Sequence, residues 1–167
     1  VETGINSDNI LSQSKRSHIF DELYKNFVVN FTYSEREDDY QDLSLLYISG
    51  EDWLEDNFVQ DLLDWRHRQG YIVHAVSTSE IGASCSSNNN CNNEDEIKEY
   101  IESAYRTWEN PPEIVGLIGD TNVIDCFYQD WGTGGWNYYN GATDFDFTDM
   151  DGDGLTSEII IGRISGQ

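Results

Sequence analysis

Short apolar runs alternate with amphipathic stretches between residues 43 and 118, and this order restricts the possible fold more than any other feature. The apolar runs lie at residues 43–48, 71–76 and 113–118. Between them, residues 51–69 and 94–108 repeat apolar side chains at helical spacing. Strand–helix alternation of this kind is typical of a mostly parallel sheet with helices packed on its faces. We therefore expect an α/β fold.

The two helical stretches carry their own end signals. Glu51 and Asp52 would place acids in the first turn of the helix over 51–69, and Gly70 stands where a helix C′ glycine belongs. Pro111 and Pro112 forbid continuation of the helix over 94–108. The predicted apolar stripes are Leu54, Phe58, Leu62 and Trp65 on the first helix, and Ile97, Ile101, Ala104, Tyr105 and Trp108 on the second.

The remaining segments set the expected domain boundaries. Residues 19–27 have helical spacing, residues 121–143 read as a long structured loop, and a last apolar run lies at 157–163. No helix is indicated before that run, so the direction of the final strand stays open. We divide the chain into an amino-terminal arm and helix over 1–42 and an α/β unit over 43–167, with about four mostly parallel strands.

The charge of the chain excludes several classes of partner. Lys and Arg number 9 and Asp and Glu number 32, which gives a formal net charge of −23. A surface this acidic repels phosphate backbones and anionic membrane surfaces, so we expect no nucleic-acid partner. No apolar run approaches the roughly 20 residues that a membrane span needs. Most of these acids are expected to serve only solubility.

An aspartate-rich loop at residues 149–158 is the strongest candidate site. Carboxylates at alternate positions can converge on one cation if the chain turns tightly, and Gly152 and Gly154 permit such a turn. Hard oxygen ligands in a flexible loop are what Ca²⁺ prefers, although the spacing is not that of an EF-hand. The alternative is an acidic turn without an ion. The predicted ligands are Asp149, Asp151, Asp153, the carbonyl of Leu155, Ser157 and Glu158.

The cysteines indicate an oxidising compartment. Cys85 and Cys91 bracket five polar residues, which leaves room for a disulfide, although two free thiols are the alternative. A disulfide would place the protein outside the cytoplasm, so we expect it to be secreted. We interpret Cys126 as a half-buried small hydrophobe. The alternative, a catalytic thiol, would need a nearby base, and no histidine lies close to it in the sequence, although one could lie close in space.

Two further features allow a functional and a structural interpretation. Trp131 and Trp136 lie on a Gly-rich segment that suits a saccharide or peptide surface, or a loop folded over the sheet edge. Asp120 follows an apolar run and would lie where ligands gather in open α/β sheets, although it suits a turn cap equally well.

Four segments, in order, resemble the first part of the gingipain-like cysteine peptidases (peptidase family C25, clan CD). They are Leu46-Tyr47-Ile48 with the helix ending in Trp65-Arg66 and Gly70, the helix around Ile97–Tyr105, the strand Val115-Gly116-Leu117-Ile118-Gly119-Asp120, and Asp151-Gly152-Asp153 through Gly162-Arg163-Ile164-Ser165. The resemblance implies a caspase-like, Rossmann-like three-layer fold and a peptidase that works by thiolate attack with histidine as the proton carrier.

The resemblance also implies that the catalytic residues lie outside this chain. In the family, the catalytic histidine (in a Gly-His-Gly context) and the nucleophilic cysteine follow the Gly-Arg segment, and this sequence has neither beyond Arg163. We therefore expect a non-catalytic amino-terminal half that needs a carboxy-terminal catalytic sub-domain, with a protein or peptide substrate. The main alternative is a non-enzymatic, calcium-stabilised adhesion module. A receiver-like domain using Asp120 is a distant third.

Overall fold

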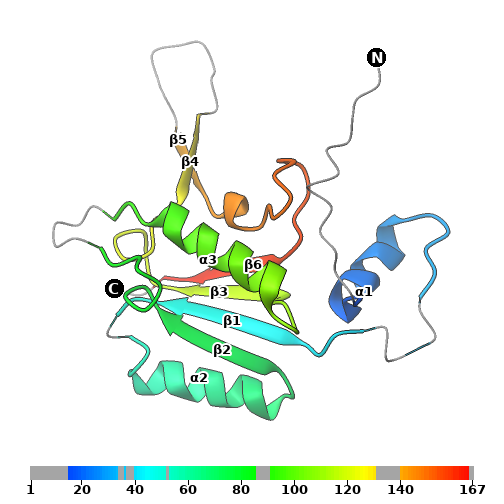
Figure 1. Ribbon diagram of the computed structural model, residues 1–167, viewed down its shortest axis with the longest axis horizontal. Helices are drawn as coiled ribbons and strands as arrows, with labels where there is room; N and C mark the ends of the chain where they lie inside the picture. Colours follow the sequence, from blue (N-terminus) through cyan, green and yellow to red (C-terminus); the bar gives the residue numbers. More distant parts are fainter. Residues whose placement is uncertain are drawn as a thin grey trace.

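A four-stranded parallel sheet forms the centre of the protein (Figure 1). The structure, a computed structural model, describes residues 15–33, 36, 40–51, 53–85, 91–130 and 140–165. Strands β1 (Ser44–Ser49), β2 (Ile72–Ser77), β3 (Ile114–Ile118) and β6 (Ile160–Ile164) lie in the order β2-β1-β3-β6. Helix α3 covers one face and helix α2 lies on the other. The expected three-layer α/β fold is confirmed.

The last strand, β6, is parallel to its neighbour β3, which decides the direction that the sequence left open. Ile114 pairs with Ile160 and Ile118 with Ile164. The chain can return to the start of the sheet without a long helix because Phe147, Met150 and Ile159 pack into the same buried cluster as α3. An irregular but buried segment therefore replaces the crossover helix that usually connects two parallel strands.

The segment over 121–143, expected to be a loop, contains a hairpin instead. Strand β4 (Phe127–Asp130) pairs antiparallel with β5 (Asn140–Thr143), and a 3-10 turn, η3 (Phe145–Phe147), follows. Of the four residues of β5, Asn-Gly-Ala-Thr, only Thr favours strands, so the local sequence does not indicate this strand. Pairing with Phe127 and its neighbours compensates for that weakness.

Helix α2 (Asn57–Arg68) begins later than the sequence predicted. Its N-cap is Asp56, whose side chain accepts a hydrogen bond of 2.8 Å from the backbone N–H of Phe58. Glu51 lies in the turn before the helix rather than in its first turn, which contains no acid. A capping carboxylate satisfies one of the free N–H groups of the first turn, and this fixes the start. At the other end, Gly70 has a φ of +94°, as its predicted position requires.

The predicted apolar stripe of α2 is wrong in part. Phe58 is 85% exposed and Trp65 is 48% exposed. The residues that pack against Leu45, Tyr47 and Ile118 of the sheet include Val59, Leu62 and Leu63. Both stripes have helical spacing, and the compact aliphatic one faces the strands while the aromatic one faces outward.

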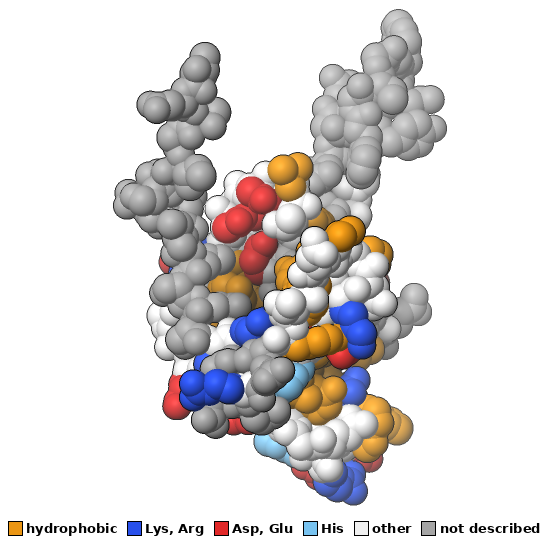
Figure 2. Space-filling model, turned by 90° about the vertical axis from the view of Figure 1, so that its right-hand side faces the viewer, with side chains coloured by type: hydrophobic (Ala, Val, Ile, Leu, Met, Phe, Trp, Pro, Cys, Tyr) orange, Lys and Arg blue, Asp and Glu red, His pale blue; other side chains and the backbone are white. Residues whose placement is uncertain are grey.

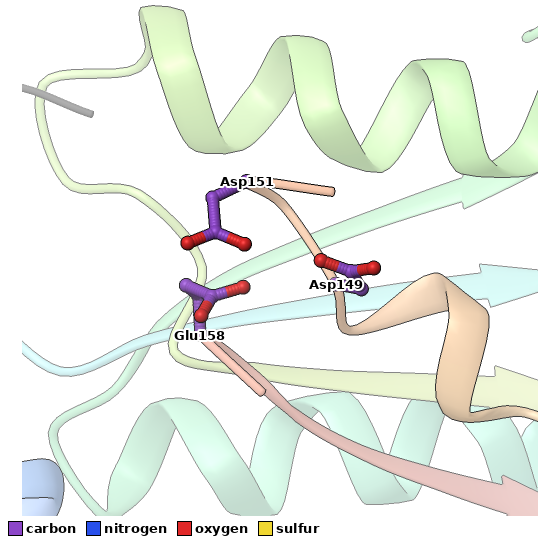
Figure 3. A group of neighbouring side chains, drawn as sticks. All are labelled: Asp149, Asp151 and Glu158. Atoms are coloured by element: carbon purple, nitrogen blue, oxygen red, sulfur yellow. The ribbon is translucent and has the colours of Figure 1, made fainter. Parts of the chain in front are cut away.

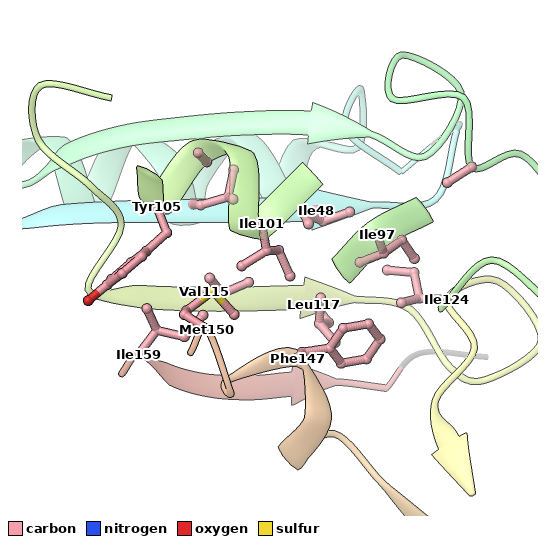
Figure 4. Close-up of a cluster of buried hydrophobic side chains, with 13 residues drawn as sticks. Ile48, Ile97, Ile101, Tyr105, Val115, Leu117, Ile124, Phe147, Met150 and Ile159 are labelled. Carbon is pink, nitrogen blue, oxygen red and sulfur yellow. The ribbon is translucent and has the colours of Figure 1, made fainter. Parts of the chain in front are cut away.

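Helix α3 (Glu94–Thr107) follows the prediction closely. Its buried residues are Ile97, Ile101, Ala104 and Tyr105. Trp108 is the C-cap and packs against the same core while partly buried. Figure 4 shows this core, in which side chains from α3, β1, β3 and the segment before β6 meet. The core on the α3 face is therefore continuous from the sheet centre to β6.

Helix α1 (His18–Phe27) is held near the start of the sheet by polar contacts. Asp21 is 5% exposed and forms an ion pair of 2.8 Å with Arg16, and it accepts a hydrogen bond of 2.8 Å from the Tyr40 hydroxyl. The His18 ring stacks on Tyr40 at 3.8 Å between centroids. Phe27, at the end of the helix, is 81% exposed. Within the described residues, no helix has the length and apolar character needed to cross a membrane.

Candidate functional site

The aspartate-rich loop lies between η3 and β6, and three of its carboxylates converge there (Figure 3). Asp149, Asp151 and Glu158 each offer one oxygen, and these oxygens lie within 4.8 Å of one another. Asp149 is 8% exposed, whereas the other two are partly exposed. The face drawn in Figure 2 shows one group of acidic side chains in its upper part, and further acids lower down beside Lys and Arg side chains.

The turn that brings these carboxylates together depends on Asp149. Its two carboxylate oxygens accept hydrogen bonds from the backbone N–H groups of Gly152 (2.7 Å) and Gly154 (3.0 Å). Both glycines have φ near +70°, at +76° and +67°, a conformation that other residues rarely adopt. The Met150 side chain is 1% exposed and anchors the loop in the core.

Glu158 closes the loop onto its own start. One of its carboxylate oxygens accepts a hydrogen bond of 2.8 Å from the backbone N–H of Met150, and the other accepts one of 2.9 Å from the Thr156 hydroxyl. Arg106, from α3, donates to the Met150 carbonyl at 2.6 Å. The loop is thus fixed from both sides, and each of these carboxylate oxygens keeps a lone pair that a cation could use.

Of the predicted carboxylate ligands, Asp153 does not belong to this group. The Asp153 carboxylate accepts hydrogen bonds from the backbone N–H groups of Leu155 (2.7 Å) and Thr156 (3.0 Å), and these lower its pKa. The Ser157 hydroxyl lies 2.8 Å from that of Thr148. The Leu155 carbonyl and Ser157 stay predictions as ligands. The sequence pattern could not separate a carboxylate that caps a turn from one that faces the others.

Arg163, at the carboxyl end of the sheet, forms contacts that the sequence did not predict. Arg163 of β6 pairs with Asp144 at 2.6 Å, and its side chain is only 12% exposed. It also donates to the carbonyls of Gly119 (3.2 Å), Ile124 (2.6 Å) and Asp125 (3.2 Å). This guanidinium therefore ties β6 to the segment that follows β3.

Asp120 lies in that same segment and caps a turn. Its carboxylate accepts a hydrogen bond of 2.8 Å from the backbone N–H of Thr121, and its carbonyl accepts from Val123 and Ile124. Asp120 is not part of the candidate metal group found among the described residues, which is formed by Asp149, Asp151 and Glu158. The structural interpretation of Asp120 therefore fits better than phosphoryl chemistry.

The cysteines divide into a close pair and one isolated thiol. Cys85 and Cys91 are at disulfide distance, with their Cα atoms 4.9 Å apart. Cys126 is a buried free cysteine, 2% exposed. Burial raises the pKa of its thiol. Trp131 and Trp136, the predicted ligand surface, lie outside the described residues.

The chain matches peptidase family C25 over residues 38–167. No curated protein sequence matches it. The crystal structure of the Arg-specific cysteine proteinase gingipain R (RgpB) aligns with a TM-score of 0.58 and 19% identity over 80% of this chain. The complex of Porphyromonas gingivalis RgpB pro- and mature domains gives a TM-score of 0.57 and 19% identity over 74%.

A further structure, described only as that of a protease, gives a TM-score of 0.54 and 23% identity over 74% of this chain. This chain spans about a quarter of the length of the three structures, at 24%, 26% and 25%. At these identities the likeness establishes the fold, whereas the sequence match extends over most of the chain. The protein therefore belongs to peptidase family C25.

Proposed function

We propose that this chain is the non-catalytic amino-terminal half of a secreted, gingipain-like cysteine endopeptidase. The thiol and the imidazole that cleave the peptide bond would lie on another part of the same enzyme. The observation that carries this proposal is the match to peptidase family C25 in a chain whose cysteines and histidines form no catalytic pair. All three histidines and all three cysteines of the sequence are within the described residues.

The free thiol of Cys126 is poorly suited to nucleophilic attack. A catalytic cysteine needs a lowered pKa and a nearby base, because the thiolate is the nucleophile. Burial instead raises the pKa of Cys126, and its side chain hydrogen-bonds with Tyr128. The charged groups that act on it are Asp125, Arg163 and Asp144, none of which is a histidine.

The three histidines lie on different elements, and two of them contact aromatic rings. His18 stacks on Tyr40 at the amino-terminal helix, and His74 of β2 lies 4.3 Å from the Trp108 ring. His67 is exposed near the end of α2. Burial lowers the pKa of His74, with a smaller effect of His67 in the same direction. These positions support structural roles for the three imidazoles.

Secretion is proposed from the cysteine pair. Cys85 and Cys91 sit at disulfide distance, and disulfides persist in oxidising compartments. The proposed substrate is a protein or peptide, in keeping with the family.

The test compares this chain with the enzyme expressed from its complete gene. Both are incubated with a panel of chromogenic peptide substrates and with a peptidyl chloromethyl ketone that alkylates catalytic thiols. We expect this chain to hydrolyse nothing and to gain no mass at Cys126, while the complete enzyme is alkylated at a different cysteine. Hydrolysis by this chain that disappears in Cys126→Ser would refute the proposal.

We also propose that the aspartate-rich loop holds a structural Ca²⁺. The support is the convergence of Asp149, Asp151 and Glu158, since hard carboxylate oxygens suit this ion. The ion would stabilise the folded state by an amount set by its concentration relative to Kd, about 2.7 kcal/mol at 100 times Kd. It would neutralise part of the local negative charge and hold the segment before β6.

The Ca²⁺ proposal predicts a specific thermal shift. The unfolding midpoint should rise with CaCl₂ beyond the rise in NaCl of equal ionic strength. In Asp151→Asn, this extra rise should disappear. The asparagine keeps a side-chain oxygen that can accept the hydrogen bond from the backbone N–H of Asp153. Asp61→Asn, an exposed acid on α2, is the matched control and should keep it. Equal Ca²⁺ responses in both variants would exclude this loop as the site.

A further inference from the structure

Helix α2 covers only part of its face of the sheet. Its inner residues pack with the cluster of Leu45, Tyr47 and Ile118, and its main strand contact is β2, at one edge of the sheet. On the opposite face, α3 and the segment before β6 bury a cluster that spans β1, β3 and the start of β6. The α2 side of β6 therefore lacks an equivalent covering layer among the described residues, whereas β3 is covered by the cluster that α2 packs on.

The uncovered surface, which we call the open face, is apolar and uncharged. Side chains alternate along a strand, so the residues of β3 and β6 that point to the α2 side are those in register with Ile114 and Ile118. They are Ile114, Gly116, Ile118, Ile160, Gly162 and Ile164. The three on β3 are covered by the chain's own Leu45, Tyr47 and Ile118 cluster, so the open face consists of the three on β6. In a chain with a formal net charge of −23, the absence of a charge from all six of these positions favours a buried surface.

Strand β6, at the edge of the sheet, is less covered on this side than β3. Ile164 is 50% exposed, and neither Ile160 nor Ile164 belongs to a core cluster. Gly116 of β3 and Gly162 of β6, which pair in the sheet, also differ in how much space surrounds them. A Cβ at Gly116 would lie 2.5 Å from the Tyr47 ring, whereas one at Gly162 would meet nothing within 4 Å. Among the described residues, the space above β3 is thus filled by the Tyr47 ring, and the space above Gly162 of β6 is open.

We propose that the open face binds an amphipathic helix from the remaining part of the same peptidase. This inference rests on the proposed function. Parallel sheets are normally covered by helices on both faces, so a helix is the element that completes the third layer. The match covers only 24–26% of the related peptidase structures, so these contain further elements that could supply such a helix.

Charge argues against a second copy of this chain as the occupant. Two copies that met at this face would bring together two bodies of formal net charge −23 each. Such repulsion opposes self-association. A helix with an apolar stripe and a basic outer side would gain from the same field instead.

The test measures whether the open face is covered in the complete peptidase. Ile164→Cys and Gly162→Cys place a thiol on the face, and Phe58→Cys places one on the exposed outer side of α2 as the control. Each variant is made in this chain and in the complete peptidase, and iodoacetamide labelling of that one site is followed by peptide mass mapping. Circular dichroism confirms that each variant is folded.

In the complete peptidase, we expect labelling at positions 162 and 164 to be at least tenfold slower than in this chain, and labelling at position 58 to be unchanged. Equal rates at positions 162 and 164 in both proteins would overturn the inference. So would protection in this chain alone that grows with its concentration, because a second copy would then be the occupant.

Peptidase activity of the same preparations separates the two proposals. Protection of the open face in a complete protein without thiol-dependent activity would leave the inference standing and remove the proposed function. Activity without protection would do the reverse.

Discussion

Glu113 is a buried acid that the proposed chemistry does not use. It is 3% exposed, and neither carboxylate oxygen makes a hydrogen bond of normal geometry. Burial raises its pKa, opposed by smaller effects of Ser17, the backbone of Ser44, Gln41 and His18. A raised pKa in the folded state favours the neutral form, so its contribution to stability is present at acid pH and is lost as pH rises through that pKa.

Glu113→Gln should therefore gain stability relative to the unmodified chain as pH rises. Glutamine stays neutral, so the variant avoids burying a charge at pH 8 but has no such advantage at pH 4. We expect the difference in unfolding free energy to change by on the order of 1 kcal/mol between these pH values. Urea unfolding at each pH measures it. Glu109→Gln, an exposed position, is the control, and the idea fails if both variants show the same pH dependence.

At the scale of elements, Arg163 joins β6 to the segment after β3. It pairs with Asp144 and donates to three carbonyls. Arg163→Met would leave these acceptors and one carboxylate without a partner. We expect a loss of about 3 kcal/mol in unfolding free energy, as for one partner of a buried pair. Arg68→Met on α2 changes an exposed residue whose guanidinium donates to the nearby Asp64 carbonyl, and it should cost little in the same assay.

The paired glycines of β3 and β6 offer a matched comparison. Gly116→Ala would push its methyl group against the Tyr47 ring, whereas Gly162→Ala meets open space. Overpacking of a core usually costs about 1–3 kcal/mol, so we expect that loss for the first variant and little change for the second. Chemical unfolding of this chain measures both. Equal losses would mean that strand conformation, rather than the Tyr47 contact, decides the effect.

The sequence predicted the elements whose signal is local. Apolar runs and helical spacing located β1, β2, β3 and α3, since each of these buries a regular pattern. Two helical stripes overlap on α2, and only the packed sheet selects Val59 over Phe58. The β4–β5 hairpin depends on pairing between distant residues, which no single strand reveals.

The sequence also predicted where the candidate site lies, but not which of its residues come together. Alternating carboxylates indicated the aspartate-rich loop, but which of them converge depends on the turn that Asp149 makes with Gly152 and Gly154. Asp153 has the same spacing and caps a different pair of N–H groups. The Arg163 contacts join residues up to 44 positions apart, so spacing along the chain carries no signal for them.

For the whole molecule, the dominant electrostatic feature is an excess of negative charge, −23 in 167 residues. Folding brings these carboxylates closer together than in the unfolded chain, so their mutual repulsion lowers the stability of the compact state. Added salt screens that repulsion, with a Debye length of about 30 Å at 0.01 M and about 10 Å at 0.1 M. Stability should therefore rise with ionic strength even without a specific ion.

We expect the thermal midpoint of this chain to rise by several degrees between 0.01 M and 0.1 M NaCl. A rise of about 2–4 °C corresponds to on the order of 1 kcal/mol for a chain of this size. Choline chloride should act equally, because screening depends on ionic strength and not on the identity of a monovalent cation. Asp61→Asn and Asp64→Asn together, both exposed on α2, should raise the midpoint in 0.01 M NaCl and reduce its salt dependence. A midpoint that falls with salt would instead show that favourable ion pairs, such as Arg163 with Asp144, outweigh the general repulsion.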